Sequence, residues 1–266
     1  MTDWVRSRIG HSTPDSITVC GYDLADELMG RVSFADLAFL LVARRRPAPG
    51  EARLFDAVLV SLADHGLTPT VLAARLTHTG APESLQGAVA AGLLGAGSVF
   101  LGPTGDTATF LRGLVEGDGL GPDSTDEAVA GAAERAVAAL AEAGRRVPGL
   151  GHPIHKELDP RVPRLYAIAT EAGVLGPHLR LLEAVRAANE KRSGRRLPIN
   201  GAGAAGAALA DLGLADSARG FALLARTAGL LGHLAEEAEH PLGMPLYREL
   251  DERMTYDPDP HEDGAR

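Results

Sequence analysis

Residues 146–161 read RVPGLGHPIHKELDPR, and no other stretch of the chain is as informative. One proline and two glycines form a loop that leaves backbone N–H and C=O groups open to a ligand. The imidazole of His152 exchanges protons near neutral pH, and Arg161 can hold a carboxylate through two parallel hydrogen bonds. This combination suits an anionic acyl substrate. By itself, the loop is equally consistent with an ordinary turn before a capped helix.

Length, composition and charge limit the classes of protein. The chain has 266 residues and 45% hydrophobic content, enough to bury a large core as one domain or two lobes. Its formal net charge of −9 argues against nucleic-acid binding, which needs a basic face. Basic residues cluster at 44–46, 145–146 and 191–196. These clusters suit the phosphates of a small ligand, although solvated helix ends look the same.

Cysteine content and apolar runs bear on location and metals. Cys20 is the only cysteine, so the chain forms no internal disulfide, lacks the thiolates of a typical zinc site, and suits a reducing cytoplasm. We therefore predict no metal and a cytoplasmic protein. The first residues do not resemble a secretory signal. Residues 85–101 are apolar but shorter than the ~20 residues of a spanning helix, so they predict a buried helix and no membrane partner.

The hydrophobic period is helical along most of the chain. Apolar residues recur at intervals of three and four over residues 34–42 and 54–62. The first series is Phe34, Leu37, Ala38, Leu41 and Val42. Ser33 and Asp36 resemble a helix cap. Further helices are expected at 126–143, 162–172, 178–193, 201–212 and 217–238. Few windows alternate as strands do, so we predict an all-α fold with a disordered tail at residues 255–266.

Residues 201–206, GAGAAG, fit the glycine pattern of dinucleotide-binding folds. That interpretation requires a strand before the glycines and a second strand about 20 residues later. Pro198 lies within the first would-be strand, and residues 217–238 are helical in pattern. We therefore favour the alternative that these small residues let a helix approach its neighbour closely.

The sequence PGLGH ending at His152, followed by Lys156 and the Asp-Pro-Arg that ends at Arg161, resembles the active-site loop of the citrate synthase superfamily. The short citryl-CoA lyase-like branch is the more similar one. Further segments resemble the superfamily in the expected order, at residues 9–30, 33–47, 63–67, 197–200 and 225–229. The resemblance covers about residues 9–250. It implies a citrate synthase-like helical domain over residues 1–254, with a smaller lobe at roughly 145–220. The chain is shortened between Pro47 and His65.

The resemblance also implies a chemistry, in which a C–C bond is made or cleaved between an acyl-CoA thioester and an α-keto acid. Coenzyme A would be part of the substrate, with no tightly bound cofactor, and a di- or tricarboxylate would be the other ligand. The implied catalytic residues are His152 and His65, and the implied carboxylate ligands are Arg161, Arg226 and His240. The implied coenzyme contacts are Val147, Pro148, Gly149, Leu150, Gly151, Lys156 and Asn200. His240 stands where the family lends an arginine across a dimer interface, so a homodimer is expected.

Two of these residues also have structural explanations. Taken alone, His65 is slightly better explained as a helix N-cap or a core histidine than as a substrate contact. Arg226 lies in an apolar run and needs a partner to offset its desolvation, and an acid such as Glu236 or Glu237 would serve as well as a substrate carboxylate.

The chain departs from the family pattern at two catalytic positions. The histidine that holds the enolate is matched by Phe100, and the catalytic aspartate by Ala202. Neither side chain donates a hydrogen bond to an enolate or accepts a proton. Three interpretations follow: a lyase-like enzyme with substitute groups, a non-catalytic binding homologue, or a structural subunit. The candidate substitutes are His155, Asp106 and the Glu236–Glu237 pair.

Overall fold

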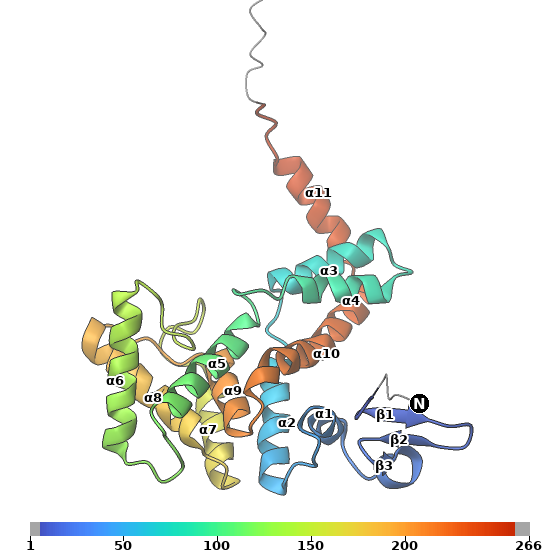
Figure 1. The fold of residues 1–266 in the computed structure, drawn as a ribbon. Helices are drawn as coiled ribbons and strands as arrows, with labels where there is room; N and C mark the ends of the chain where they lie inside the picture. Colours follow the sequence, from blue (N-terminus) through green and yellow to red (C-terminus); the bar gives the residue numbers. More distant parts are fainter. Residues whose placement is uncertain (1–5, 259–266) are drawn as a thin grey trace, which may run out of the picture. The chain divides into compact units, whose positions relative to one another are not determined.

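The computed structural model describes residues 6–258, which are mostly helical (Figure 1). The predicted all-α class is confirmed. The chain forms two compact units, of which the first comprises Met1–His65 and Ala96–Ala228 and the second Gly66–Gly95 and Gly229–Arg266. Helix α10 (Ala218–Glu239) contributes to both units.

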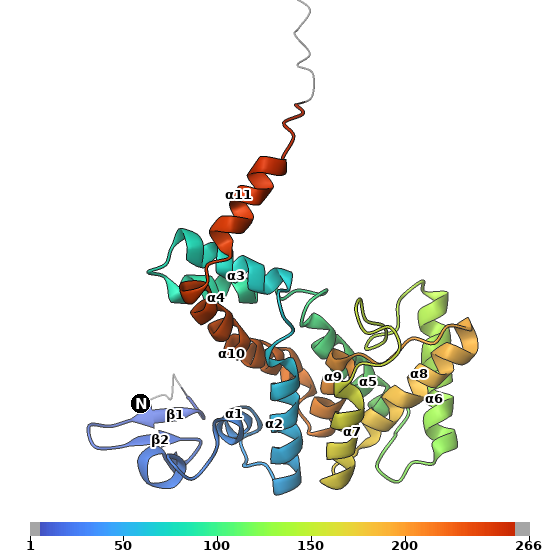
Figure 2. The same ribbon diagram turned by 180° about the vertical axis from the view of Figure 1, so that it is seen from behind.

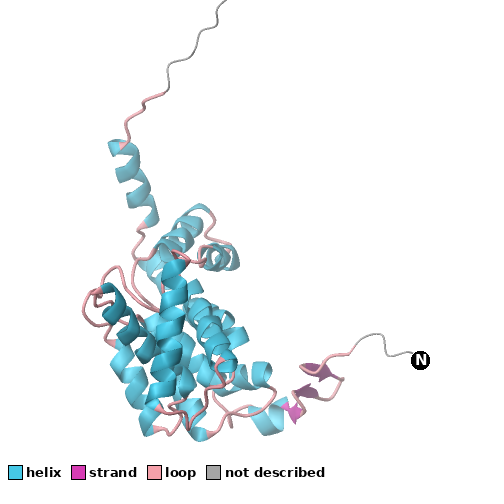
Figure 3. Cartoon of the chain, turned by 60° about the vertical axis from the view of Figure 1, so that its left-hand side comes forward, coloured by secondary structure: helices cyan, strands magenta, loops and turns pink. Residues whose placement is uncertain are grey.

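A small antiparallel sheet near the N-terminus was not predicted. Strands β1 (Gly10–Ser12), β2 (Ile17–Val19) and β3 (Tyr22–Asp23) pair in that order and lead into a π-helical turn, η1 (Leu24–Leu28). Figure 3 shows that the strands are confined to this segment. Strands of two or three residues are too short to show an alternating pattern, so the sequence carried little signal for them.

The other helices of the first unit follow the predicted order, except that α5 was not predicted. They are α1 (Phe34–Ala43), α2 (Pro49–Ala63), α5 (Gly102–Gly117), α6 (Asp126–Glu142), α7 (Arg161–Glu171), α8 (Pro177–Ser193), α9 (Gly201–Asp211) and the 3-10 turn η2 (Ala215–Ser217). Ser33 and Asp36 form the expected capping box of α1. The predicted apolar face of α1 is partly wrong, because Phe34 is exposed and Phe39 is buried instead.

The core of the first unit is centred on three aromatic rings. Phe55 contacts Phe39 and Phe221 edge-on, with ring centroids 5.4 and 4.8 Å apart. Edge-to-face contact places the positive ring edge against the negative ring face. Buried leucines of α2, α8 and α9 belong to the same core. This packing holds α10, which carries Arg226, and α2, which ends just before His65.

Helix α9 lies in the middle of the first unit, and its glycines allow that position. A Cβ atom at Gly203 would lie 2.6 Å from the backbone of Gly149, and one at Gly206 would clash with the carbonyl of Thr104 on α5. The segment before α9 forms only an isolated bridge between Ile199 and Leu150, not a strand. The close-approach explanation of GAGAAG is therefore supported, and the strand that a dinucleotide site requires is not present in this described segment.

Residues 145–220, the range of the predicted smaller lobe, lie within the first unit. Helices α7 and α9 pack against α2, α9 also packs against α5, and α8 packs against α6, all within the first unit. Figure 2 shows α6 and α8 side by side from behind. Helices α7, α8 and α9 thus pack on helices that precede them in the chain and share one unit with them.

The second unit contains α3 (Pro69–Gly80), α4 (Leu85–Leu94), the end of α10 and α11 (Gly243–Arg253). Its small core consists of Val71, Ala74, Ala88, Leu230 and Leu234. The prediction of one buried helix over residues 85–101 is wrong, because α4 ends at Leu94, whose side chain is 87% exposed. None of the described helices combines the length and apolar character needed to cross a membrane. Most of the predicted tail lies outside the described residues.

Candidate active site

The loop at residues 147–151 is held against the start of α9. Gly149 and Gly151 both adopt positive φ angles, of 82° and 80°. The N–H of Gly151 donates to the carbonyl of Pro198 at 2.7 Å, and the N–H of Asn200 donates to the carbonyl of Gly149 at 2.9 Å. The Asn200 side chain donates to the carbonyl of Gly151 at 2.8 Å and caps α9 by accepting from the N–H of Gly203. Asn200 thus positions the loop.

Asp159 and Arg161 form a buried ion pair at the start of α7. The Asp159 side chain is fully buried and accepts from Nε of Arg161 at 2.9 Å and from Nη2 at 2.7 Å. It also accepts from the N–H of Gly201 at 2.7 Å. Burial opposes ionisation, but the guanidinium and these N–H groups lower the pKa of Asp159 from 3.8 to about 2. The carboxylate is therefore ionised, and it occupies two donors of Arg161.

Arg161 and Arg226 meet at the C-terminal end of α2. Nη1 of Arg161 donates to the carbonyl of Ser61 at 3.1 Å, and Nη2 of Arg226 donates to the next carbonyl, that of Leu62, at 3.2 Å. Both cations thus lie at the negative end of the helix dipole. Arg226 is only 6% exposed, and burial lowers its pKa while the charge of Asp64 opposes that shift. Two guanidinium groups therefore lie close together in a region that is partly shielded from water.

Three imidazole rings gather beside these arginines. The ring centroids of His65 and His152 are 5.2 Å apart, those of His152 and His155 are 4.5 Å apart, and those of His65 and His155 are 5.8 Å apart. Burial lowers the pKa of His65, and the charges of Arg161, His155 and Arg226 lower it further. Burial also lowers the pKa of His152. These two imidazoles are therefore predominantly neutral at pH 7.

The hydrogen bonds of His152 fix its tautomer. Its Nδ1 accepts from the backbone N–H groups of Ile154 at 3.1 Å and His155 at 3.0 Å. An acceptor nitrogen carries no proton, so in the neutral ring Nε2 carries it and acts as a hydrogen-bond donor. The Nζ atom of Lys156 donates to the carbonyl of His152 at 3.3 Å and helps to hold this turn.

The three histidines are spaced as metal ligands could be, since one ligand atom from each lies within 4.8 Å of the others. The donor set fits poorly, however. A metal at Nε2 of His152 would have to replace the proton that the backbone N–H groups place there, whereas metal-bound histidines normally donate from the other ring nitrogen. The arrangement favours a proton-donating imidazole.

A cavity of about 800 Å³ adjoins His152. The predicted coenzyme residues Val147, Leu150 and Gly151 line it, together with apolar Val137 and Leu197. Its basic lining residues are Arg145, Arg146, Arg192 and Arg195. Within the part of the chain that the structure describes, none of these four arginines forms an ion pair with an acid. Lys191 belongs to the same basic cluster in sequence but pairs with Glu134 at 2.7 Å.

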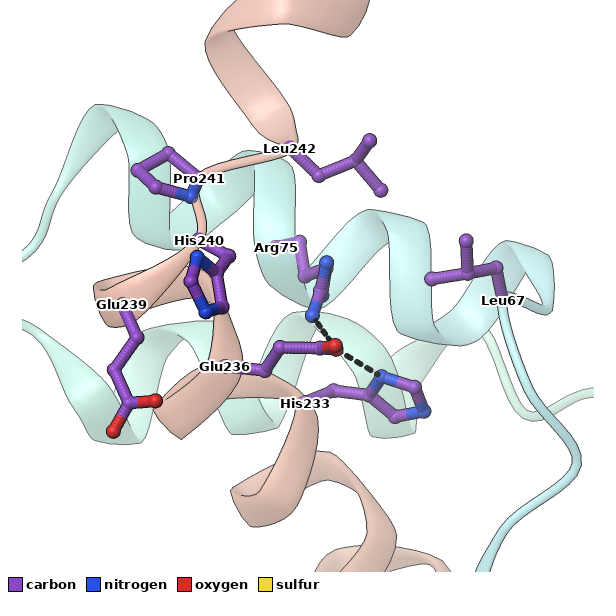
Figure 4. Close-up of a pocket in the computed structure, with 8 residues that line it drawn as sticks. All are labelled: Leu67, Arg75, His233, Glu236, Glu239, His240, Pro241 and Leu242. Carbon is purple, nitrogen blue, oxygen red and sulfur yellow. Dashed lines mark hydrogen bonds and ion pairs between the residues drawn. The ribbon is translucent and has the colours of Figure 1, made fainter.

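The structure thus brings together His65, His152, Arg161 and Arg226, which the family resemblance implied as catalytic and carboxylate-binding residues. It places His240 in the second unit, where it lines another cavity with Arg75, His233 and Glu236 (Figure 4). Arg75 pairs with Glu236 and with Glu237, the latter at 3.5 Å. The suggestion that Glu236 or Glu237 neutralises Arg226 is therefore not supported.

Phe100 and Ala202, where the chain departs from the family pattern, lie in different parts of the first unit. Phe100 is half-buried in the turn before α5, and Ala202 lies in the first turn of α9. Asp106, a candidate substitute, forms an exposed ion pair with Arg219 at 2.7 Å. Sequence reasoning missed the role of Asp159. The acid two residues before Arg161 was a usable signal, whereas the Ser61 and Leu62 carbonyls gave none.

Comparison with known proteins identifies the family. The family model for the C-terminal domain of citrate synthase matches residues 32–248. The chain belongs to the citrate synthase family. It is similar to the structure of citryl-CoA lyase from Hydrogenobacter thermophilus, with a TM-score of 0.85, 28% identity and coverage of 98% of each chain.

Two longer proteins of this group are also similar. The structure of ATP citrate lyase from Methanothrix soehngenii, in complex with citrate and coenzyme A, has a TM-score of 0.75 at 23% identity, covering 99% of this chain and 43% of that one. A probable ATP-citrate synthase of Dictyostelium discoideum is 26% identical over 262 residues, which cover 91% of this chain. The chain spans only 39% of that curated relative.

Proposed function

We propose that this citrate synthase-family protein is a citryl-CoA lyase-like enzyme, which makes or cleaves a C–C bond between an acyl-CoA thioester and an α-keto acid. The observation that carries the proposal is the fixed Nε2–H donor of His152, which lies near Arg161 and at a cavity lined by arginines. The neighbouring His65 lies in the field of both Arg161 and Arg226. A donor of this kind polarises a keto group or holds a tertiary hydroxyl group. The similarity to citryl-CoA lyase over nearly the whole chain supports the same chemistry.

The carboxylate group of the substrate is assigned chiefly to Arg226. Nε and Nη2 of Arg161 already donate hydrogen bonds to Asp159. Arg161 therefore contributes its positive charge to substrate binding more than a bidentate hydrogen bond. Arg226 donates only to the Leu62 carbonyl among the hydrogen bonds described above, and its burial strengthens its interaction with an anion. Its pKa is lowered by burial, so binding of an anion should also favour its charged form.

Coenzyme A is assigned to the arginine-lined cavity. Its volume of about 800 Å³ lies within the usual range of ligand pockets. The apolar wall formed by Val147 and Leu150 suits the pantetheine arm, and the four arginines suit the phosphates. In this assignment Lys156 and Asn200 position the loop and do not contact the coenzyme.

A second candidate function is binding without turnover. The observation that favours it is the chemistry of Phe100 and Ala202, which supply neither the oxyanion donor nor the base of the family pattern. Loss of one oxyanion donor typically costs ~10²–10³ in rate, and loss of general-base catalysis costs ~10²–10⁴. The two candidates share the same ligands and differ only in turnover.

Calorimetry with coenzyme A and with pantetheine tests the cavity. The double variant Arg192→Ala/Arg195→Ala should weaken coenzyme A binding by about tenfold or more, since each charge-assisted hydrogen bond is worth ~1.5–3 kcal/mol. Binding of pantetheine, which lacks the phosphates, should change little. The exposed Arg31 provides a control, Arg31→Ala, which should leave both affinities unchanged. If the double variant loses the same affinity for pantetheine as for coenzyme A, the assignment of these arginines to the phosphates is refuted.

Turnover is tested by mass spectrometry of a citryl thioester incubated with the protein. Release of acetyl-CoA supports the enzyme, whereas binding of coenzyme A and citrate with no turnover across an acyl-CoA panel supports the binding homologue. Arg226→Gln should weaken citrate binding by about 10- to 100-fold at unchanged coenzyme A affinity. If citrate affinity survives this change, the carboxylate lies elsewhere.

A further inference from the structure

The cleavage of a citryl-type thioester moves one proton. This argument rests on the proposed function. The hydroxyl O–H bond breaks, the C–C bond to the thioester arm breaks, and the departing carbon gains a C–H bond to become a methyl group. The oxygen that loses the proton and the carbon that gains it are bonded to the same carbon atom. One base that reaches both atoms can therefore carry the proton from the first to the second, and no oxidant or further reactant is needed.

The acids suggested from the sequence as substitutes for the missing base, and also Asp159, are excluded by their settings. Asp106 is paired with Arg219, and Glu236 and Glu237 are engaged with Arg75 in the second unit. Asp159 is fully buried and held ionised by Arg161. Among these acids, none combines an available lone pair with a place beside His152.

His155 remains, and its position suits the task. Its ring lies 4.5 Å from the ring of His152 and 5.8 Å from that of His65. Its backbone N–H donates to Nδ1 of His152, so one turn of the chain places both rings. Among the described residues, the His155 ring makes no hydrogen bond that fixes its tautomer or blocks a nitrogen. It can therefore present either a lone pair or a proton to a substrate.

The neighbouring rings have different roles. His152 is held as an Nε2–H donor by two backbone N–H groups. His65 lies in the field of Arg161 and Arg226, which disfavours a second positive charge there. An added proton is therefore disfavoured on both of these rings.

We propose that His155 is the acid–base residue of this protein and replaces, by proton shuttling, the base missing at Ala202. In the cleavage direction a nitrogen lone pair of His155 removes the hydroxyl proton while His152 donates a hydrogen bond to the same oxygen. The C–C bond electrons pass to the thioester arm as an enolate, and the oxygen forms the keto group. The His155 imidazolium then returns the proton to the enolate carbon. Synthesis follows the same steps in reverse.

The test compares His155→Gln with the matched control His11→Gln, a substitution of an exposed histidine on β1. His155→Gln should lower kcat for citryl-CoA cleavage by ~10²–10⁴, because general acid–base catalysis is removed. Affinities for coenzyme A and citrate should stay within about threefold of wild type, since a base acts in the transition state and not in binding. Added imidazole should restore part of the rate to His155→Gln. His11→Gln should match the wild type.

The outcomes separate this inference from the proposed function. If the wild type cleaves citryl-CoA and His155→Gln cleaves it equally well, the shuttle is refuted and the enzyme assignment stands. If the wild type binds neither coenzyme A nor citrate, the proposed function fails and the shuttle fails with it. If the wild type binds both but cleaves nothing, the shuttle is also refuted. Activity that EDTA abolishes and Zn²⁺ restores would make His155 a metal ligand and would overturn the proposal.

Discussion

At the scale of single residues, the Asp159–Arg161 pair shows that Arg161, predicted to bind the substrate carboxylate, also has a structural role. Arg161 was expected to grip a substrate, yet two of its donors hold a fully buried carboxylate. Removing one partner from such a pair leaves an uncompensated buried charge, which typically costs 3–5 kcal/mol. An Arg161→Ala variant would therefore lose stability as well as affinity, so Arg226 is the cleaner probe of carboxylate binding.

The stability contributed by Asp159 should depend on pH. Its pKa in the folded protein is about 2, below the ordinary value of 3.8. The ionised form thus contributes about 2 kcal/mol above pH 3.8, and this contribution is lost as the pH falls towards 2. Urea unfolding should show Asp159→Asn to be less stable than the wild type at neutral pH, with the difference narrowing in acid. The control Asp216→Asn, at an exposed partner of Arg112, should show only a small difference in stability from the wild type. If the difference in unfolding free energy between Asp159→Asn and the wild type does not narrow in acid, the prediction is contradicted.

The two departures from the family pattern can be reversed together. The double variant Phe100→His/Ala202→Asp should raise enolisation of acetyl-CoA, measured as deuterium exchange into its methyl group. Each single variant should gain far less, because a base without an oxyanion donor forms an unstabilised enolate and a donor without a base has nothing to stabilise. Ala202 is flanked by two glycines and is half-buried, so an aspartate has room there. A folded double variant that binds acetyl-CoA but exchanges no faster than the wild type would show that these two positions do not match the family's catalytic pair.

At the scale of elements, helix α9 and the 147–151 loop form one structural unit. Asn200 caps the helix and bonds to the loop, and Gly203 lets the loop backbone pass against the helix. The helix reaches α5 through Gly206 in the same way. The placement of the proposed coenzyme wall therefore depends on positions in α9 that touch no ligand themselves.

Gly203→Ala tests this dependence. Its Cβ would lie 2.6 Å from Gly149, so the loop must move, and we expect a loss of about 1–3 kcal/mol in unfolding free energy from overpacking. Coenzyme A affinity should fall as well, because the cavity wall is displaced. Gly113→Ala in α5 is a matched control with nothing within 4 Å of the added Cβ. It should gain about 0.5–1 kcal/mol, because alanine is the better helix former. Unchanged affinity in a folded Gly203→Ala protein would argue against the proposed wall.

At the scale of the whole molecule, the second unit has little core of its own. Five small or medium side chains are buried together there, while several large apolar residues of its helices are exposed. On α11 these are Met244, Tyr247 and Leu250, and Met254 follows at the C-cap of the helix. Such a stripe usually packs against something, and a second copy of the chain remains the partner that the sequence predicted.

Light scattering at micromolar concentration should therefore show a homodimer. Leu94 of α4 is 87% exposed, and Leu94→Lys should shift the equilibrium towards monomer if α4 belongs to the interface. Val60→Lys, at an exposed apolar position of α2, is the matched control and should leave the mass unchanged. A wild-type monomer at this concentration would overturn the prediction.

The sequence by itself determined the helical class, the order of most helices and the family, because these follow from local periodicity and from short motifs such as PGLGH before His152. It also named His65, His152, Arg161 and Arg226 as members of one site. Tertiary structure decided which groups each of them contacts. Arg161 and Arg226 each donate to a backbone carbonyl at the end of α2, and the donor tautomer of His152 is set by two N–H groups of its own turn. Backbone groups are common to all residues, so only folding reveals which of them meet a given side chain. The same reason explains the wrong buried helix at 85–101, where turn geometry at residues 95–101 interrupted an apolar run that the sequence pattern alone continues.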